Sequence, residues 1–83
     1  LDIDYIKIDK KFIDNLEQLI NDRLLCQAII TMAHTLGLKV IAEGVETKSQ
    51  QTILSEMDCD YVQGFYYDKP LEAQDFEARY LLD

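Results

Sequence analysis

The sequence has 83 residues, enough for one compact unit and near the lower size at which a chain stabilises its own core. Hydrophobic residues make up 48% of it and charged residues 29%, a balance typical of a folded chain rather than a disordered one. With 16 acidic and 8 basic residues the net charge is −8, which argues against nonspecific binding to DNA, RNA or an anionic membrane. The only basic cluster, Lys7, Lys10 and Lys11, still allows a phosphate-bearing ligand.

The rest of the composition indicates a reducing compartment. Cys26 and Cys59 form no Cys-x-x-Cys spacing and no cluster with histidine, so a structural zinc site is not expected. Two buried free thiols are the simpler interpretation, and they favour the cytoplasm. No apolar run approaches the roughly 20 residues of a membrane span. Because the sequence starts at Leu1, we expect further residues before it.

The first half of the chain predicts a strand and a helical region. Residues 4–9, DYIKID, favour a short strand bounded by aspartates. Helical spacing then recurs in fragments, and Asn21 or Asp22 is placed to cap a clearer helix, DRLLCQAIITMAHTLG. Gly37 suits the left-handed residue that follows a helix. The apolar positions expected to face the core from this helix are Leu25, Ala28, Ile29, Met32, Ala33 and Leu36.

The second half predicts two more strands with helices after them. LKVIAEGV is apolar without alternation, which is typical of a parallel strand covered on both faces. Thr47 and Gln50 match a capping box at the start of a helix. DYVQGFYY, residues 60–67, predicts a third strand, and Pro70 is expected near the first turn of a last helix. The core-facing residues expected in that helix are Ala73, Phe76, Tyr80 and Leu81.

The order of these elements is β-α-β-α-β-α, which predicts parallel strands and right-handed crossovers. Three such units do not close a barrel, and three parallel strands leave two open sheet edges. The sequence therefore predicts self-association through those edges when the chain is alone.

Polar side chains collect where the predicted strands end. These are Lys7 and Asp9, then Glu43 and Glu46, then Gln63. In parallel α/β folds such residues converge on one rim. Carboxylates there would bind Mg²⁺ or Mn²⁺ and activate water, and a lysine would neutralise phosphate oxygens.

Each of these residues also has a structural interpretation. Lys7 would then extend to solvent, Asp9 would cap the following helix, and Gln63 would bond the backbone. Glu46 would favour the nearby helix N-terminus or a salt bridge. Glu43 is expected to be buried and therefore to need a partner. The only histidine, His34, lies near a helix C-terminus, where we expect it to cap carbonyl groups.

Three longer motifs carry a family resemblance. DYIKIDKKFI, AIITMAHTLGLKVIAEGVET and CDYVQGFYYDKPLEAQDFE together closely resemble the C-terminal third of EAL domains, bacterial cyclic di-GMP phosphodiesterases. The resemblance implies that residues 1–83 are one partial domain. It would be the last three βα units of a TIM-like (β/α)8 barrel, with no second domain.

The resemblance also implies a reaction and a set of site residues. The family hydrolyses one phosphodiester bond of cyclic di-GMP to give linear pGpG, with two Mg²⁺ or Mn²⁺ ions. Lys7 matches the lysine near the attacking water and the phosphate, and Gln63 the glutamine of the active-site network. Glu43 matches the glutamate at the second metal, which it reaches directly or through water, and which is also discussed as a base. Asp9 and Glu46 belong to the same motifs in supporting roles.

Some family features differ or lie outside this sequence. Lys10-Lys11 and Asp68 replace the usual Arg-Ser and Ser, and we expect little chemical consequence because these positions are outside the catalytic set. The Glu-Ala-Leu motif, the Asn and Glu ligands and the Asp-Asp pair are not in these residues. The isolated chain is therefore expected to be inactive and to hold no metal pair by itself.

Two kinds of parent protein remain open at this stage. One is an active phosphodiesterase, which the presence of Lys7, Glu43 and Gln63 favours. The alternative is a degenerate EAL domain that binds cyclic di-GMP as a sensor or scaffold. Either parent would work in the bacterial cytoplasm, with possible membrane anchoring through other domains, and could dimerise through its EAL domain.

Overall fold

The computed structural model describes residues 4–64 and, as backbone only, the short strand at 71–72. The elements in chain order are β1 (Tyr5–Ile8), α1 (Lys10–Ile13), α2 (Ile20–Thr35), β2 (Lys39–Val45), α3 (Lys48–Glu56), β3 (Tyr61–Gly64) and β4 (Leu71–Glu72). The sheet order is β1-β2-β3-β4, with β1, β2 and β3 parallel and β4 antiparallel to β3. The three predicted parallel strands are thus confirmed.

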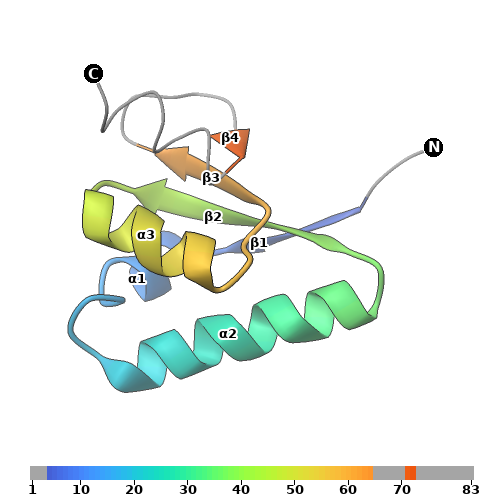
Figure 1. Ribbon diagram of the computed structural model, residues 1–83, viewed down its shortest axis with the longest axis horizontal. Helices are drawn as coiled ribbons and strands as arrows, with labels where there is room; N and C mark the ends of the chain where they lie inside the picture. The colour runs from blue at the N-terminus through green and yellow to red at the C-terminus, as the bar shows by residue number, and fades with distance from the viewer. Residues whose placement is uncertain (1–3, 65–70, 73–83) are drawn as a thin grey trace.

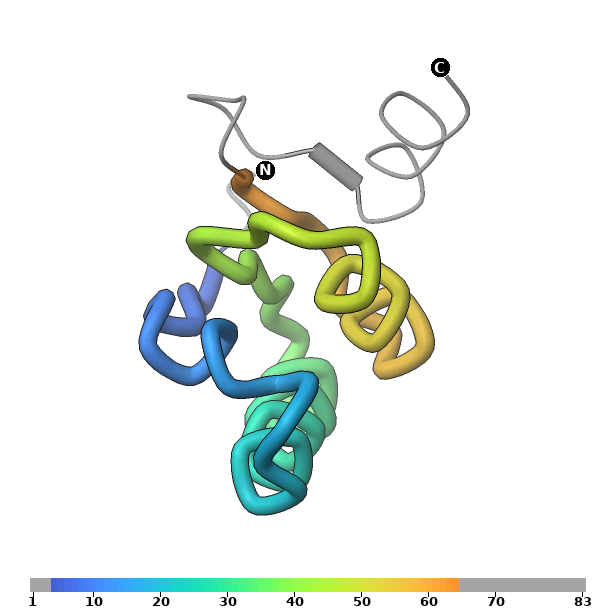
Figure 2. Tube along the Cα trace, turned by 90° about the vertical axis from the view of Figure 1, so that its left-hand side faces the viewer, coloured from blue at the N-terminus to red at the C-terminus, as the bar shows by residue number. Residues whose placement is uncertain are grey.

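The fold has two layers. Helices α2 and α3 lie on the same side of the sheet, and α1 lies beyond the end of β1 (Figure 1 and Figure 2). Ile8, Ala42 and Val62 form one row across the three parallel strands and are buried beneath the helices. Burial of an aliphatic side chain as large as that of Ile8 or Val62 stabilises the fold by about 1.5–3 kcal/mol. The helices contribute buried side chains to the same core, among them Cys26, Ile30, Ala33 and Leu54.

The prediction for the start of α2 was wrong. Neither Asn21 nor Asp22 is the cap, because the helix already begins at Ile20 and Leu19 precedes it without a side-chain hydrogen bond. Asp22 lies in the first turn, where the helix dipole favours an acidic residue. Arg23 reaches back to the carbonyl oxygens of Leu16 and Glu17 and so fixes the preceding loop.

The predicted core face of α2 was also wrong in part. Leu25, Met32 and Leu36 are 41%, 58% and 67% exposed, and the stripe that packs on the sheet is Cys26, Ile30 and Ala33. The helix therefore has two apolar stripes. One meets the sheet, and the other lies beside the free edge of β1, where the described residues offer nothing to cover it.

The end of α2 follows the sequence prediction. Gly37 has φ +77°, in the left-handed region that glycine favours. The N–H of Gly37 donates to the His34 carbonyl at 3.0 Å, and the N–H of Leu38 donates to the Ala33 carbonyl at 2.8 Å. These two bonds form a Schellman motif, which satisfies carbonyl groups at the helix end and turns the chain into β2.

His34 is structural, as expected, but not as a cap. Its Nε2 lies 2.7 Å from Oδ2 of Asp60, which also accepts the N–H of Val40 at 2.9 Å. Burial favours the neutral form of Asp60. The hydrogen bonds from His34 and Val40 and the charge of Lys39 outweigh this and hold the pKa of Asp60 below its usual value. The Asp60 carboxylate therefore ties the end of α2 to the starts of β2 and β3.

The predicted capping box of α3 is confirmed. Thr47 accepts the N–H of Gln50 at 3.1 Å, and Oε1 of Gln50 accepts the N–H groups of Glu46 and Thr47. Gln50 is buried, and its Nε2 donates to the carbonyl of Ile13 at 3.2 Å. One side chain thus joins the start of α3, the end of β2 and the end of α1.

The prediction of a last helix with its first turn near Pro70 was wrong at residues 71–72. Leu71 and Glu72 form β4 instead, and they pair with Val62 and Tyr61 of β3. β4 therefore covers one of the two sheet edges that we expected to be open. The rest of the predicted third strand and of the last helix lies outside the described residues. Within the described part of the chain, no helix has the length and apolar character needed to cross a membrane.

Candidate active site

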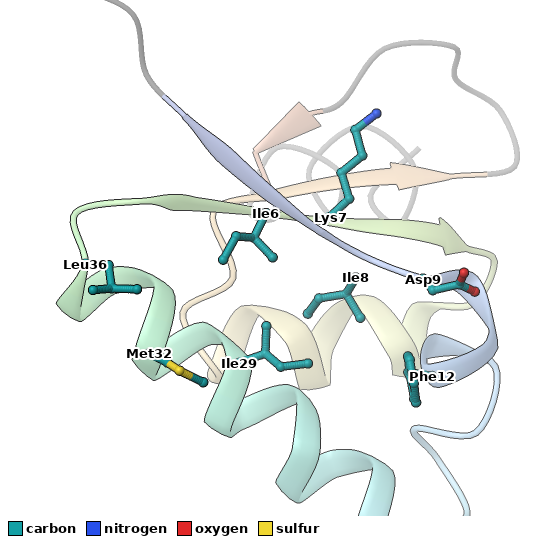
Figure 3. Close-up of a pocket in the computed structure, with 8 residues that line it drawn as sticks. All are labelled: Ile6, Lys7, Ile8, Asp9, Phe12, Ile29, Met32 and Leu36. Carbon is teal, nitrogen blue, oxygen red and sulfur yellow. The ribbon is translucent and has the colours of Figure 1, made fainter.

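The three main site residues lie on one face of the sheet. Side chains alternate along a strand, so Lys7 and Glu43 point away from the helix-covered face that holds Ile8 and Ala42. Gln63 is the register partner of Glu43 on β3 and shares its face. Figure 3 shows Lys7 extending to the side of β1 opposite to α2, while Ile8 points toward the helices. The convergence expected from the sequence is thus present in the register.

Lys7 is set back from the other two. Lys7 pairs with Ile41 of β2, which is two residues before Glu43. Glu43 and Gln63, by contrast, lie directly opposite each other on the adjacent strands β2 and β3. Lys7 is exposed, and Glu43 and Gln63 are half-buried. We expected Glu43 to be buried against a partner, but it is half-buried, and its carboxylate has no hydrogen bond or ion pair within residues 4–64. Such a carboxylate is available to a ligand.

Gly44 explains how β2 ends. It has φ +71°, and the pairing of β2 with β3 shifts there, since Glu43 pairs with Gln63 and Val45 with Gly64. Gly44 is thus a bulge residue, which redirects the strand just after Glu43. A Cβ atom at Gly44 would lie 3.0 Å or less from three side-chain carbons of Lys10. The group that approaches this glycine closely is therefore the side chain of Lys10.

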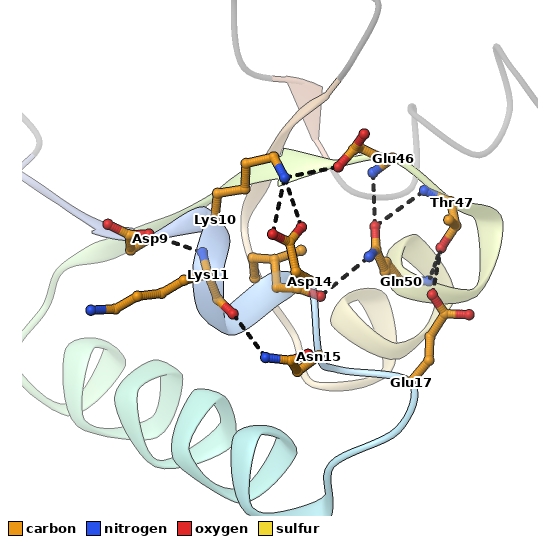
Figure 4. Close-up of polar contacts among 10 residues, drawn as sticks. Asp9, Lys10, Lys11, Asp14, Asn15, Glu17, Glu46, Thr47 and Gln50 are labelled. Carbon is orange, nitrogen blue, oxygen red and sulfur yellow. Dashed lines mark hydrogen bonds and ion pairs between the residues drawn. The ribbon is translucent and has the colours of Figure 1, made fainter.

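The two supporting residues have identified contacts. Asp9 precedes α1 and accepts the N–H of Lys11 at 2.9 Å, so its carboxylate caps the helix. Glu46 forms an ion pair with Lys10, whose Nζ lies 3.0 Å from Oε1 of Glu46 and 2.9 Å from Oδ1 of Asp14 (Figure 4). The hydrogen bond to Asp14, followed by that to Glu46, raises the pKa of Lys10.

The basic cluster expected from the sequence does not converge. The ammonium of Lys10 is held by carboxylates, and that of Lys11 lies 5.2 Å from the centre of the Phe12 ring, a cation–π contact. Lys7 extends over the face of the sheet away from the helices, as Figure 3 shows, and this face, which carries Lys7, Glu43 and Gln63, is the open face. A phosphate at this site would therefore meet one lysine rather than three.

Metal ligands are incomplete in the described part of the chain. Residues 4–64 contain no group of three or more histidine, cysteine, aspartate or glutamate side chains placed to hold a metal ion. Glu43 fits as a single carboxylate ligand at the strand end, and a two-metal site needs several more. Both cysteines are free and buried, and burial raises their pKa to about 11 for Cys26 and about 12 for Cys59. Neutral buried thiols of this kind are structural.

Comparisons with known proteins agree with this geometry. Residues 1–70 match the EAL domain family. The signaling protein YkoW of Bacillus subtilis is 44% identical over 72 residues, which are 87% of this chain and 9% of that protein. The probable cyclic di-GMP phosphodiesterase PdeB of Escherichia coli is 45% identical over 76 residues, 92% of this chain and 14% of that protein.

Solved structures give the same result. An EAL domain protein from Listeria monocytogenes superposes with a TM-score of 0.74 at 37% identity, covering 100% of this chain and 34% of the other. The phosphodiesterase MucR of Pseudomonas aeruginosa, solved as a complex with cyclic di-GMP, superposes with a TM-score of 0.74 at 38% identity. It covers 92% of this chain and 31% of the other. EAL domains are TIM-like barrels, and the parallel βα units of this chain match a part of such a barrel. The chain belongs to the EAL domain family, and it spans about a third of the solved domains that it matches.

The contacts of Lys10 were not foreseen from the sequence. Lys10 packs against Gly44 and forms an ion pair with Glu46, one and three residues after Glu43. The spacing of Lys10 and Asp14 on one helical turn was a readable signal for their pairing. The contact with Glu46 joins residues far apart in the sequence, so no local pattern indicates it.

Proposed function

We propose that residues 1–83 are the final third of an EAL domain that hydrolyses one phosphodiester bond of cyclic di-GMP to give linear pGpG. The observation that carries the proposal is the shared open face of Lys7, Glu43 and Gln63, with Glu43 half-buried and without a partner in residues 4–64. The names of MucR and PdeB, which include this activity, support it. Because Cys26 and Cys59 are free, a reducing bacterial cytoplasm suits the protein.

Each of the three residues has a role in this proposal. The ammonium of Lys7 lies beside the phosphate and orients the water that attacks phosphorus. The carboxylate of Glu43 accepts a proton from that water or binds a metal ion, and the amide of Gln63 holds the neighbouring groups in place. Bound Mg²⁺ or Mn²⁺ would lower the pKa of water and neutralise phosphate charge. The bond from phosphorus to the ribose oxygen then breaks, and that oxygen takes up a proton from solvent as it leaves.

The experiment is a product assay with cyclic di-GMP and Mg²⁺. We expect the complete protein to form pGpG and the isolated 83-residue chain to form none, because Glu43 supplies only one of the metal ligands that the reaction needs. Turnover by the isolated chain would contradict the second expectation. A complete protein that binds the nucleotide and leaves it unchanged would support the sensor instead and overturn the hydrolase.

We further propose that the isolated chain pairs with a second copy of itself through the free edge of β1. This edge is continuous with an apolar groove of about 350 Å³ between β1 and α2 (Figure 3). Its lining includes Ile6, Ile8, Phe12, Ile29, Met32 and Leu36. In the complete barrel the preceding βα unit would occupy this place, and its absence leaves both backbone groups and apolar side chains exposed.

Sedimentation velocity tests the pairing. We expect a dimer for the isolated chain and a shift toward monomer in Met32→Glu, which places a charge in the groove. Glu56→Gln, on the exposed side of α3, is the control and is expected to remain dimeric. A monomeric wild-type chain across the concentration range would refute the proposal.

A further inference from the structure

Lys10 contacts two residues shortly after Glu43 in the chain, Gly44 and Glu46. Its ammonium lies 3.0 Å from a carboxylate oxygen of Glu46, and its aliphatic stem occupies the space over Gly44. The same ammonium lies 2.9 Å from Oδ1 of Asp14, the residue that caps the end of α1 (Figure 4). One side chain thus connects α1 to the end of β2.

The end of β2 is held from two sides. On one side, Lys10 of α1 forms an ion pair with Glu46. On the other side, Oε1 of Gln50, a residue of α3, accepts a hydrogen bond of 2.8 Å from the N–H of Glu46. Two residues before Glu46 lies Gly44, the bulge residue that sets the direction of the chain immediately after Glu43. The position of the Glu43 carboxylate therefore depends on how this bulge is packed.

The contribution of Lys10 is expected to be local. Both of its ion pairs are exposed to solvent, and such pairs add little to the global stability of a protein. Without the ammonium, however, Asp14 and Glu46 are left as two carboxylates without the cation that both contact. Their repulsion acts on the segment that contains the bulge.

We propose that Lys10 is a positioning residue, which fixes the bulge at Gly44 through its contacts with Gly44 and Glu46 and thereby sets the position of Glu43. The inference rests on the proposed function, because it concerns the same carboxylate. It assigns a role to a residue outside the set that contacts the substrate.

The test uses the complete protein and three variants. Lys10→Met keeps the aliphatic stem and removes the charge, Lys10→Arg restores a cation that can bind two carboxylates, and Lys11→Met is the matched control on the same helix. The first readout is amide hydrogen exchange of a peptide spanning residues 39–47, measured by mass spectrometry. The second is the separation of kcat from KM for cyclic di-GMP.

We expect Lys10→Met to speed exchange in residues 44–46 about 5-fold, with Lys10→Arg and Lys11→Met close to wild type. We expect kcat of Lys10→Met to fall about 10-fold with KM nearly unchanged, because a small displacement of a reacting group lowers the rate strongly. Unchanged exchange would overturn the proposal, as would faster exchange with an unchanged kcat.

Failure of the proposed function gives a different result. If the wild-type protein forms no pGpG, only the hydrolase is refuted, and cyclic di-GMP affinity replaces kcat as the second readout. Lys10→Met is then expected to weaken nucleotide binding about 5-fold relative to Lys11→Met. Equal affinities for these two variants would overturn the positioning role.

Discussion

Replacing Glu43 by glutamine in the complete protein is expected to lower kcat by at least about 100-fold. Glutamine keeps the size of the side chain, but it can neither take a proton from water nor bind a metal ion as an anion, and a positioned base contributes about 10²–10⁴-fold. Glu43 is half-buried on the open face beside Gln63 and has no partner within residues 4–64. Its loss should therefore leave the fold intact.

The measurement is steady-state hydrolysis of cyclic di-GMP at saturating nucleotide. Glu56→Gln, an exposed position on α3, removes the same charge far from the open face and is expected to match wild type within about 2-fold. A Glu43→Gln variant with wild-type kcat would show that the carboxylate does not take part in the reaction. Equal losses in both variants would point to net charge rather than to the site.

Replacing Gly44 by alanine is expected to destabilise the complete protein by about 3 kcal/mol. Two costs combine here: a left-handed backbone costs a non-glycine residue about 1–2 kcal/mol, and an overpacked contact about 1–3 kcal/mol. The added methyl group would meet the stem of Lys10 close to its backbone, where the side chain has little freedom to move. The same substitution should displace Glu43 and reduce turnover.

Gly37 provides the matched control for this prediction. Its φ of +77° is close to that of Gly44, but a Cβ there would meet no atom within 4 Å. Gly37→Ala is therefore expected to cost only about 1 kcal/mol in urea unfolding. Addition of Lys10→Ala to Gly44→Ala should recover part of the loss, since it removes two of the contacting carbons. Equal destabilisation by the two glycine variants would mean that the contact with Lys10 is unimportant.

The sequence predicted those features that depend on short stretches of chain. The strands at residues 5–8 and 39–45, the Schellman turn at Gly37 and the capping box at Thr47 all follow from neighbouring residues. The strand-end rule also placed Glu43 and Gln63 together correctly. The local features can be predicted from the sequence because the residues that form each of them lie within a few positions of one another.

The errors concern contacts between distant parts of the chain. The periodic stripe through Met32 and Leu36 predicts the core face of α2, but in the structure it borders the free edge of β1. Periodicity identifies an apolar stripe on a helix, but it does not identify the element against which that stripe packs. Likewise, only the fold identifies Lys10 as the side chain that packs against Gly44.

The most direct test of the proposed site is a crystal structure of the complete protein, as the slow Glu43→Gln variant, bound to cyclic di-GMP. We predict that a phosphate of the nucleotide lies on the open face of β1, β2 and β3, in contact with Lys7 and next to Gln63. A nucleotide bound instead in the groove between β1 and α2, or at a place that none of these strands reaches, would contradict the proposed site.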